Sequence, residues 1–346
     1  METKGYAAMD AKAALQPFDF TRRELGAHDV GFDILFSGIC HSDIHQVHED
    51  WGRALFPMVP GHEIVGVVSA IGTDVTKFVV GERIGVGTFV DSCRTCDSCV
   101  NGDQQYCLEG NNQTYNGLER DGVTPTRGGY CDKFVVDEDY AFHIADSLDL
   151  KGVAPLLCAG ITLFSPLRHW NAAPGRRVGI IGLGGLGHMG VKFSHALGAS
   201  TTVFSHSPAK QRDALALGAD DFVVSNDTDE MKSRKETYDL IINTASADID
   251  LTPYLELLKV DGTLVVVGLP GVPYRIEAWP FVTRRRSLAG SSTAGIAETQ
   301  AMLDFCAEHD ITSDVEVVSA DYINAAYART LDADVKYRFV IDASTF

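Results

Sequence analysis

The chain has 346 residues, of which 45% are hydrophobic and 22% charged, values typical of a folded globular protein rather than a disordered or fibrous one. Its 29 basic and 47 acidic residues give a net charge of −18, which would repel a phosphate backbone, so we expect no nucleic-acid partner. No stretch approaches the roughly 18–20 apolar residues of a membrane span, and residues 1–15 lack the pattern of a signal peptide. We therefore expect a cytoplasmic protein without a membrane partner, built from two domains.

The first 150 residues are rich in glycine and carry short runs of β-forming residues. Residues 64–71 and 77–86 are two such runs, and glycines bound both of them. Short strands separated by turn residues are typical of all-β structure. We therefore expect a β-rich domain over residues 1–152.

From about residue 153 the pattern changes to strands that alternate with helices. The predicted strands are 177–182, 201–205, 221–225, 238–243 and 264–268, and the predicted helices are 187–197 and 208–217. This alternation is typical of a doubly wound α/β fold, which we assign to residues 153–294. The remaining segment, 295–346, contains one amphipathic helix at 297–309 and ends in a strand at 337–342.

Four of the eight cysteines fall within one short loop, and they are Cys93, Cys96, Cys99 and Cys107. Closely spaced thiolates on a loop can supply the tetrahedral site that Zn²⁺ prefers, and a closed four-thiolate site is structural. We expect a structural zinc lobe over about residues 91–108. An iron–sulfur cluster and four unliganded thiols are the alternatives.

A glycine-rich turn follows the first strand of the α/β domain and opens a helix. It fits the G-x-G-x-x-G pattern in the strand–turn–helix context that gives this pattern its weight. Such turns bring backbone N–H groups close to a pyrophosphate. The residues expected to contact the dinucleotide here are Gly182, Leu183, Gly184, Gly185, Leu186 and Gly187. The alternative is a glycine-rich turn with no ligand.

The next strand distinguishes NADP(H) from NAD(H). An NAD site places an acid there to bind the ribose 2′-hydroxyl, but no Asp or Glu occurs between Asp149 and Asp213. Hydroxyl donors and a lysine charge suit a 2′-phosphate instead. The residues expected to bind that phosphate are Ser205, His206, Ser207 and Lys210. For Lys210 alone, a solvated helix residue is the other reading.

Three further residues of metal-ligand type lie far apart in the chain. They are Cys40 in GICHSDIH, His62 in PGHE and Cys158 in PLLCAG. Two thiolates and one imidazole leave a fourth position for water or substrate, as in a catalytic zinc site. Spacing alone does not bring these residues together, and each taken singly is more often a buried core residue.

Several segments together resemble the zinc-dependent medium-chain alcohol dehydrogenases. They are GICHSDIH, VPGHEIVGVV, the C-x₂-C-x₂-C-x₇-C loop, APLLCAGIT, GLGGLGH and KYRFVID. The subgroup that the chain is most similar to is the cinnamyl alcohol dehydrogenase-like one, and within it the bacterial NADPH-dependent aldehyde reductases of broad substrate range. The resemblance runs almost end to end. It implies a GroES-like catalytic domain built from both chain ends, a Rossmann domain between them, and a homodimer.

Carried over by position, the resemblance implies that Cys40, His62 and Cys158 hold a catalytic zinc, which Glu63 can approach. Asp43 would accept a hydrogen bond from His62 and set its tautomer. The four cysteines of the loop match a structural zinc lobe, which makes two Zn²⁺ per chain.

The resemblance also implies a proton relay and contacts with NADP(H). Ser42 would start the relay, and His45 would lie near its solvent end, where imidazole suits proton transfer near neutral pH. The implied cofactor contacts are Ser42, Thr162, Thr244, Gly268, Ser291, Ser292 and Thr293.

We therefore expect an oxidoreductase that interconverts aldehydes and primary alcohols. A Lewis-acidic zinc would polarise the substrate carbonyl, and the nicotinamide would supply the hydride. Aromatic and aliphatic aldehydes are the expected substrates. Two alternatives remain at this point: reduction of an iminium or a conjugated C=C bond on the same fold, and a protein that binds NADPH without turnover.

Overall fold

The computed structural model describes residues 1–346, which form two compact units. The first unit comprises Met1–Ile161 and Ala294–Phe346, and the second comprises Thr162–Thr293. From the sequence, the first boundary was expected after residue 152. Residues 153–161, which include Cys158, instead lie in the first unit.

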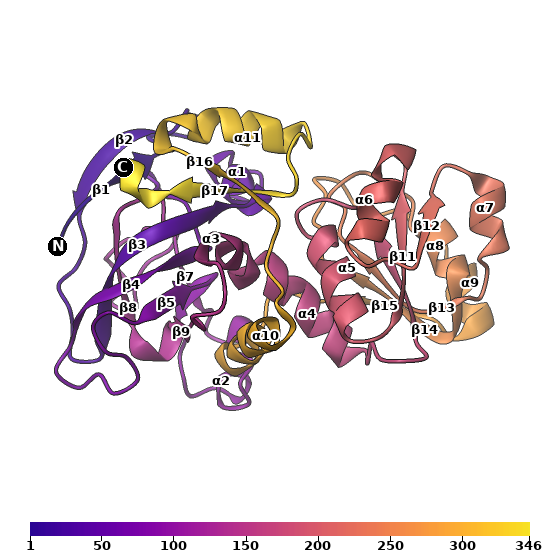
Figure 1. Ribbon diagram of the computed structural model, residues 1–346, viewed down its shortest axis with the longest axis horizontal. Helices are drawn as coiled ribbons and strands as arrows, with labels where there is room; N and C mark the ends of the chain where they lie inside the picture. Colours follow the sequence, from indigo (N-terminus) through magenta and orange to yellow (C-terminus); the bar gives the residue numbers. More distant parts are fainter. The chain divides into compact units, whose positions relative to one another are not determined.

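A seven-stranded sheet forms the centre of the first unit. Its order is β16-β17-β3-β4-β5-β9, and β8 also pairs with β3. The bounds are β3 Asp29–Ile39, β4 Ile64–Ile71, β5 Arg83–Val86, β8 Lys133–Asp137, β9 Phe142–His143, β16 Val315–Val318 and β17 Arg338–Asp342. Strand β17 pairs antiparallel with β3, so both ends of the chain build one sheet (Figure 1).

Smaller elements surround this sheet. Two-stranded sheets are formed by β1 (Glu2–Ala7) with β2 (Gln16–Thr21) and by β6 (Phe89–Asp91) with β7 (Asn112–Gln113). The helices are α1 His41–Val47, α2 Asp97–Val100, η1 Gln104–Tyr106, η2 Glu138–Tyr140, α3 Leu150–Val153, η3 Ala154–Leu157, α10 Ile296–His309, η5 Ala320–Tyr322, α11 Ile323–Leu331 and η6 Ala343–Thr345. Side chains such as Phe32, Ile64, Phe134 and Phe339 form the core of this unit.

One predicted strand of the first unit is shorter than expected. The run at 77–86 forms a strand only over β5, Arg83–Val86. Val79 and Val80 are 60% and 59% exposed, so these two side chains face away from the core. Gly81 adopts φ +94°, and this turn separates them from the strand that follows.

The second unit is a six-stranded parallel sheet in the order β12-β11-β10-β13-β14-β15. The bounds are β10 Arg177–Ile181, β11 Ser200–Ser205, β12 Asp221–Val224, β13 Tyr238–Asn243, β14 Leu258–Val266 and β15 Ser287–Gly290. Counted within the unit, this order is 3-2-1-4-5-6, that of a doubly wound dinucleotide-binding fold. The predicted fold class is confirmed.

Helices cover both faces of this parallel sheet, with α5 and α6 on one side and α7, α8 and α9 on the other (Figure 1). Their bounds are α5 Gly187–Ala196, α6 Gln211–Ala216, α7 Thr228–Ser233, α8 Thr252–Leu257 and α9 Trp279–Arg284, and α4 (Ala159–His169) precedes them. The helix predicted at 208–217 is divided into a 3₁₀ turn, η4 (Pro208–Lys210), and α6. Phe204, Ile241 and Leu264 lie in the core of this unit.

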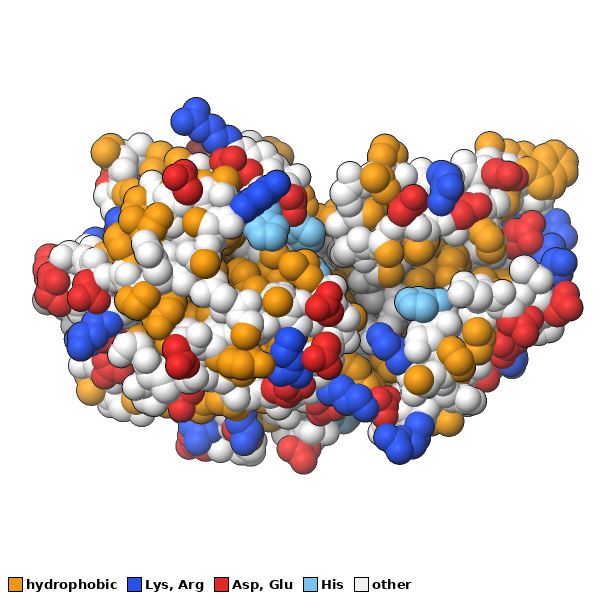
Figure 2. Space-filling view, turned by 90° about the horizontal axis from the view of Figure 1, so that it is seen from above, with side chains coloured by type: hydrophobic (Ala, Val, Ile, Leu, Met, Phe, Trp, Pro, Cys, Tyr) orange, Lys and Arg blue, Asp and Glu red, His pale blue; other side chains and the backbone are white.

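No single helix is long and apolar enough to cross a membrane; Leu150–Leu157 and Ala159–His169 reach the required length and apolar character only as a pair that is bent by 58°. On the face drawn in Figure 2, acidic and basic side chains are interspersed, and no continuous basic area is seen.

Candidate active site and cysteine loop

Four residues of the first unit form a buried cluster: Cys40, His62, Glu63 and Cys158. One ligand atom from each lies within 4.8 Å of those of the others, and the two sulfurs are 4.0 Å apart. The antiparallel pairing of β3 with β4 explains why Cys40 and His62 meet, because one follows the end of β3 and the other precedes the start of β4. Cys158 follows η3 and precedes α4.

Asp43 lies beneath this cluster and is completely buried. It occupies the N3 position of α1, where its carboxylate accepts the N–H of Cys40 at 2.8 Å, as in a capping box. It also accepts from the Gly61 N–H at 3.2 Å and the Tyr130 hydroxyl at 2.9 Å, and it lies 3.1 Å from His62 Nδ1. A proton on Nδ1 leaves the Nε2 lone pair of His62 free for a metal.

The electrostatics of the cluster favour an anionic sulfur at Cys40, whereas the hydrogen bond to Cys40 and burial raise the pKa of Cys158 well above its usual value. A hydrogen bond from Cys158 holds the pKa of the Cys40 thiol well below its usual value, although burial opposes this. Burial disfavours the imidazolium of His62, yet the Asp43 carboxylate and Cys40 raise its pKa well above normal. A cation that binds here would displace the Nε2 proton of His62 and the thiol proton of Cys158.

Glu63 supplies the clearest sign that the cluster suits a cation. Its Oε1 pairs with the buried Arg338 guanidinium, while its Oε2 is buried without any hydrogen-bond partner. Burial raises the pKa of Glu63 to about 8, despite the attraction of Arg338. Two sulfurs, an imidazole and a carboxylate oxygen form a donor set that fits Zn²⁺.

Helix α1 carries the two predicted relay residues. Ser42 Oγ lies 3.5 Å from Cys40 Sγ, at the edge of the cluster. His45 follows three residues later and is therefore on the same face of the helix. Its Nδ1 is 2.8 Å from an Asp50 carboxylate oxygen, and its ring contacts Trp51 with centroids 4.9 Å apart.

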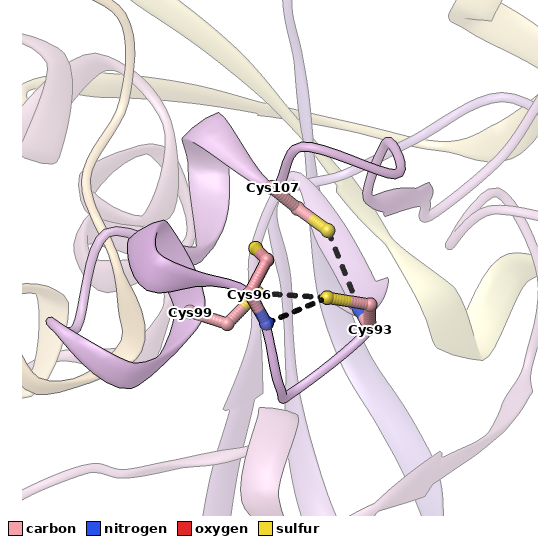
Figure 3. A group of neighbouring side chains, drawn as sticks. All are labelled: Cys93, Cys96, Cys99 and Cys107. Carbon is pink, nitrogen blue, oxygen red and sulfur yellow. Dashed lines mark hydrogen bonds between the residues drawn. The ribbon is translucent and has the colours of Figure 1, made fainter.

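The four cysteines of the cysteine loop, residues 93–107, also converge. Their sulfurs lie within 4.8 Å of one another, and Figure 3 shows the four side chains directed into one space. Hydrogen bonds from the backbone N–H groups of Thr95 and Cys96 lower the pKa of Cys93 to about 6, whereas burial raises that of Cys99 to about 11. Four sulfurs at this spacing fit a tetrahedral metal site.

In the second unit, the glycine-rich turn connects β10 to α5. Gly182 adopts φ +90°, and a Cβ on Gly187 would come within 2.2 Å of the Gly182 carbonyl oxygen, so both positions require glycine. A Cβ on Gly184 would meet nothing within 4 Å, which leaves open space beside the backbone. The Thr244 hydroxyl donates to the Ile181 carbonyl at 2.7 Å and fastens the turn to the end of β13.

The other predicted cofactor residues follow the parallel strands. Thr244 follows β13, and Thr162 lies in α4. Ser205 is the last residue of β11, and the remaining ones are His206, Ser207 and Lys210 after β11, Gly268 after β14, and Ser291, Ser292 and Thr293 after β15. The Ser207 N–H donates to Ser205 Oγ at 3.2 Å. The ammonium of Lys210 donates to the Leu183 carbonyl at 2.9 Å, which uses one of its three protons.

Sequence reasoning missed several residues that support these sites. They are Tyr130 and Tyr115 beside Asp43 and His62, Arg338 beside Glu63, and Asp50 beside His45. Arg338 lies in KYRFVID, one of the segments that carried the resemblance, but no local pattern marks it as a partner of Glu63.

Comparisons with known proteins match most of the chain. The alcohol dehydrogenase GroES-like domain model matches residues 26–146, and the zinc-binding dehydrogenase model matches residues 185–308. NADP-dependent alcohol dehydrogenase C of Mycobacterium tuberculosis is 56% identical over 98% of both chains. Aldehyde reductase YahK of Escherichia coli is 49% identical over 100% of this chain and 99% of its own. A cinnamyl alcohol dehydrogenase structure from Sorghum bicolor has a TM-score of 0.96 at 47% identity, over 99% and 98% of the two chains.

Proposed function

Since this chain belongs to the zinc-binding alcohol dehydrogenase family, as its resemblance indicated, we propose that it reduces aromatic and aliphatic aldehydes with NADPH. The protein is an oxidoreductase that interconverts alcohols and aldehydes, the reaction class of relatives that are 49% and 56% identical to it. The cofactor, the direction, the substrate range and the residues that carry the reaction are proposed below.

The buried cluster is proposed to hold the catalytic zinc through Cys40, His62 and Cys158, with Glu63 beside them. Zinc bound there would act as a Lewis acid on the carbonyl oxygen of the substrate. Asp43 fixes the tautomer of His62 through Nδ1, and Arg338 holds one oxygen of Glu63 while the other is buried without a hydrogen-bond partner.

Ser42 and His45 are proposed to move the proton that the product alkoxide requires. The Ser42 hydroxyl lies at the edge of the cluster, and His45 is half-buried on the same face of α1. With Nδ1 facing Asp50, the Nε2 atom of His45 is available to exchange a proton with solvent. Asp50 would hold the ring in that orientation.

NADP(H) is proposed as the cofactor, bound at the carboxyl ends of the parallel strands in the second unit. The relative from Mycobacterium tuberculosis is named as NADP-dependent, and no carboxylate between Asp149 and Asp213 opposes a 2′-phosphate. Ser205, Ser207 and Lys210 would bind that phosphate. The bound nicotinamide supplies the hydride, and the chain contributes the backbone turn that holds the pyrophosphate.

The cysteine loop is proposed to bind a second, structural zinc, which gives two Zn²⁺ per chain. This loop and the buried cluster together hold six of the eight free cysteines. Sulfur ligands of this kind are kept reduced in the cytoplasm, which is the proposed location.

A homodimer is proposed on the basis of the second unit's exposed sheet edge. Strand β15 pairs only with β14, so its other edge is open, and Leu288 on it is 40% exposed. Trp279 and Val282 on α9 are 73% and 78% exposed. An open edge beside exposed apolar side chains is a surface that a second copy can cover.

The observation that carries the proposal is the convergence of Cys40, His62, Glu63 and Cys158 with one carboxylate oxygen left unpaired. The test is loss of NADPH absorbance with benzaldehyde, with and without a zinc chelator. We expect turnover that the chelator abolishes and added zinc restores. No turnover with any aldehyde would contradict the proposal, and conversion of cinnamaldehyde to the saturated aldehyde would favour C=C reduction instead.

A further inference from the structure

Two buried hydroxyl groups and one sulfur of the cysteine loop are connected in series by hydrogen bonds. The Ser92 hydroxyl lies 3.1 Å from Cys99 Sγ, and the Tyr140 hydroxyl lies 2.7 Å from Ser92 Oγ. Ser92 and Tyr140 are 2% and 3% exposed, so water does not compete for these contacts. The three groups therefore form a chain that ends on a sulfur of the proposed structural zinc site.

Backbone N–H groups serve the other sulfurs of the loop. The N–H of Cys96 donates to Cys93 Sγ at 3.2 Å, that of Cys93 to Cys107 Sγ at 3.4 Å, and that of Leu108 to Cys96 Sγ at 3.4 Å. The Ser92 contact with Cys99 is the shortest of these four bonds and is made by a side chain, as is the longer contact of 3.8 Å from Thr95 Oγ1 to Cys93 Sγ. A substitution can therefore remove the Ser92 contact without altering the backbone.

The direction of the chain depends on the state of the sulfur. A thiolate that binds a metal has no proton to donate, so Ser92 must donate to Cys99 Sγ, and Ser92 Oγ can then accept from Tyr140. Hydrogen bonds aligned in one direction polarise one another and strengthen the final bond. Groups that donate to metal ligands in this way orient the ligands and tune the metal.

We propose that Ser92 and Tyr140 are positioning residues for the structural zinc, which orient the Cys99 sulfur towards the metal by donating along the chain Tyr140–Ser92–Cys99. This inference rests on the proposed zinc site in the cysteine loop. It assigns these two hydroxyls to retention of the metal rather than to general packing.

Arg94 fixes the Tyr140 end of the chain. Its guanidinium lies 5.0 Å from the centroid of the Tyr140 ring and pairs with the carboxylates of Asp91, Asp137 and Asp139. Asp137 caps η2, which ends at Tyr140. The cysteine loop is thus fastened to η2 by charge, and the hydroxyl chain runs beside that attachment.

The test measures how fast zinc passes from the full-length, zinc-loaded protein to a chromogenic chelator. The rates of the Ser92→Ala, Ser92→Thr and Tyr140→Phe variants are compared with that of the wild type. The phase that belongs to the cysteine loop is the one that Cys107→Ser removes. Ser194→Ala is a matched control, because it deletes a buried hydroxyl that contacts Thr201 Oγ1 at 2.6 Å in the second unit. The same variants loaded with Co²⁺ report the energy of the thiolate-to-metal charge-transfer band.

We expect Ser92→Ala to accelerate that phase by about tenfold, the lower end of the effect of removing such a partner, and to move the cobalt band to lower energy. Ser92→Thr should restore both values, Tyr140→Phe should change both in the same direction by less, and Ser194→Ala should change neither.

Wild-type release rates in both Ser92→Ala and Tyr140→Phe, or no rescue by threonine, would overturn the inference. If Ser92→Ala fails to fold, Tyr140→Phe decides alone, since its ring still packs on Arg94. If no phase of the wild-type protein depends on Cys107, the zinc site itself is wrong and the inference falls with it. If a Cys107-dependent phase of zinc release exists but the Ser92 and Tyr140 variants leave it unchanged, only the role of the two hydroxyls is refuted.

Discussion

Gly184→Ala separates the effect of the glycine-rich turn on nucleotide binding from its effect on stability. An added Cβ at Gly184 meets no protein atom within 4 Å, and its φ lies outside the left-handed region. Alanine fits such a position and reduces the freedom of the unfolded chain, which stabilises by about 0.4–1 kcal/mol. The thermal unfolding midpoint without cofactor should therefore stay the same or rise slightly.

Binding of NADPH should weaken, because the new methyl group would occupy the space in which the turn's N–H groups approach a pyrophosphate. One charge-assisted hydrogen bond is worth about 1.5–3 kcal/mol. Loss of a single bond would raise the dissociation constant roughly 10- to 150-fold, since about 1.4 kcal/mol is a factor of ten. Titration of NADPH fluorescence measures this constant.

Two further glycine-to-alanine variants serve as controls for this result. Gly187→Ala should lose both stability and binding, because its Cβ would lie 2.2 Å from the Gly182 carbonyl oxygen. Gly117→Ala, whose Cβ would make contacts of 3.4–3.8 Å in the first unit, should lose neither. If Gly184→Ala binds NADPH as tightly as the wild type, the turn does not hold the pyrophosphate, and the assignment of the nucleotide site is wrong.

Four other substitutions and one comparison variant test the remaining parts of the account. Cys158→Ser should abolish turnover while His45→Ala slows it and leaves the zinc content unchanged; full activity in Cys158→Ser would contradict the metal assignment. Ser205→Asp should shift the ratio of kcat/KM values for NADPH and NADH towards NADH, because a carboxylate repels the 2′-phosphate, and an unchanged ratio would count against that phosphate site. Tyr130→Phe removes one of the donors to the buried Asp43 carboxylate and should lower the free energy of unfolding by about 1.5–3 kcal/mol. Tyr327→Phe, whose hydroxyl is 3.4 Å from that of Tyr130, should cost less in the same urea titration, and equal costs would refute a specific role for the Asp43 bond.

Local patterns were sufficient to predict the architecture of the second unit. Strands at 177–181 and 238–243 and the helix from Gly187 lie where hydrophobic runs and glycines predicted them. The prediction of a strand over residues 77–82 was wrong. Two consecutive valines there indicate a strand in the sequence, but in the structure both are exposed and precede a glycine with a positive φ. Hydrophobicity alone does not predict that turn.

The partners that complete the cluster could not be predicted locally. Tyr130 lies 87 residues from Asp43, and Arg338 lies 275 residues from Glu63. They meet because β17 and β3 pair across the sheet and because the Tyr130 backbone bonds to that of Pro60 and Tyr6. Such contacts follow from the assembled fold and leave no periodic signal in one sequence.

The most direct test of the central claim is a crystal structure of the purified, never-stripped enzyme with anomalous data collected at the zinc edge. The account predicts two anomalous peaks per chain, one within the cysteine loop and one at roughly 2.0–2.3 Å from Cys40 Sγ, Cys158 Sγ and a His62 nitrogen. A single peak, confined to the cysteine loop, would contradict the claim that the buried cluster binds the metal on which aldehyde reduction depends.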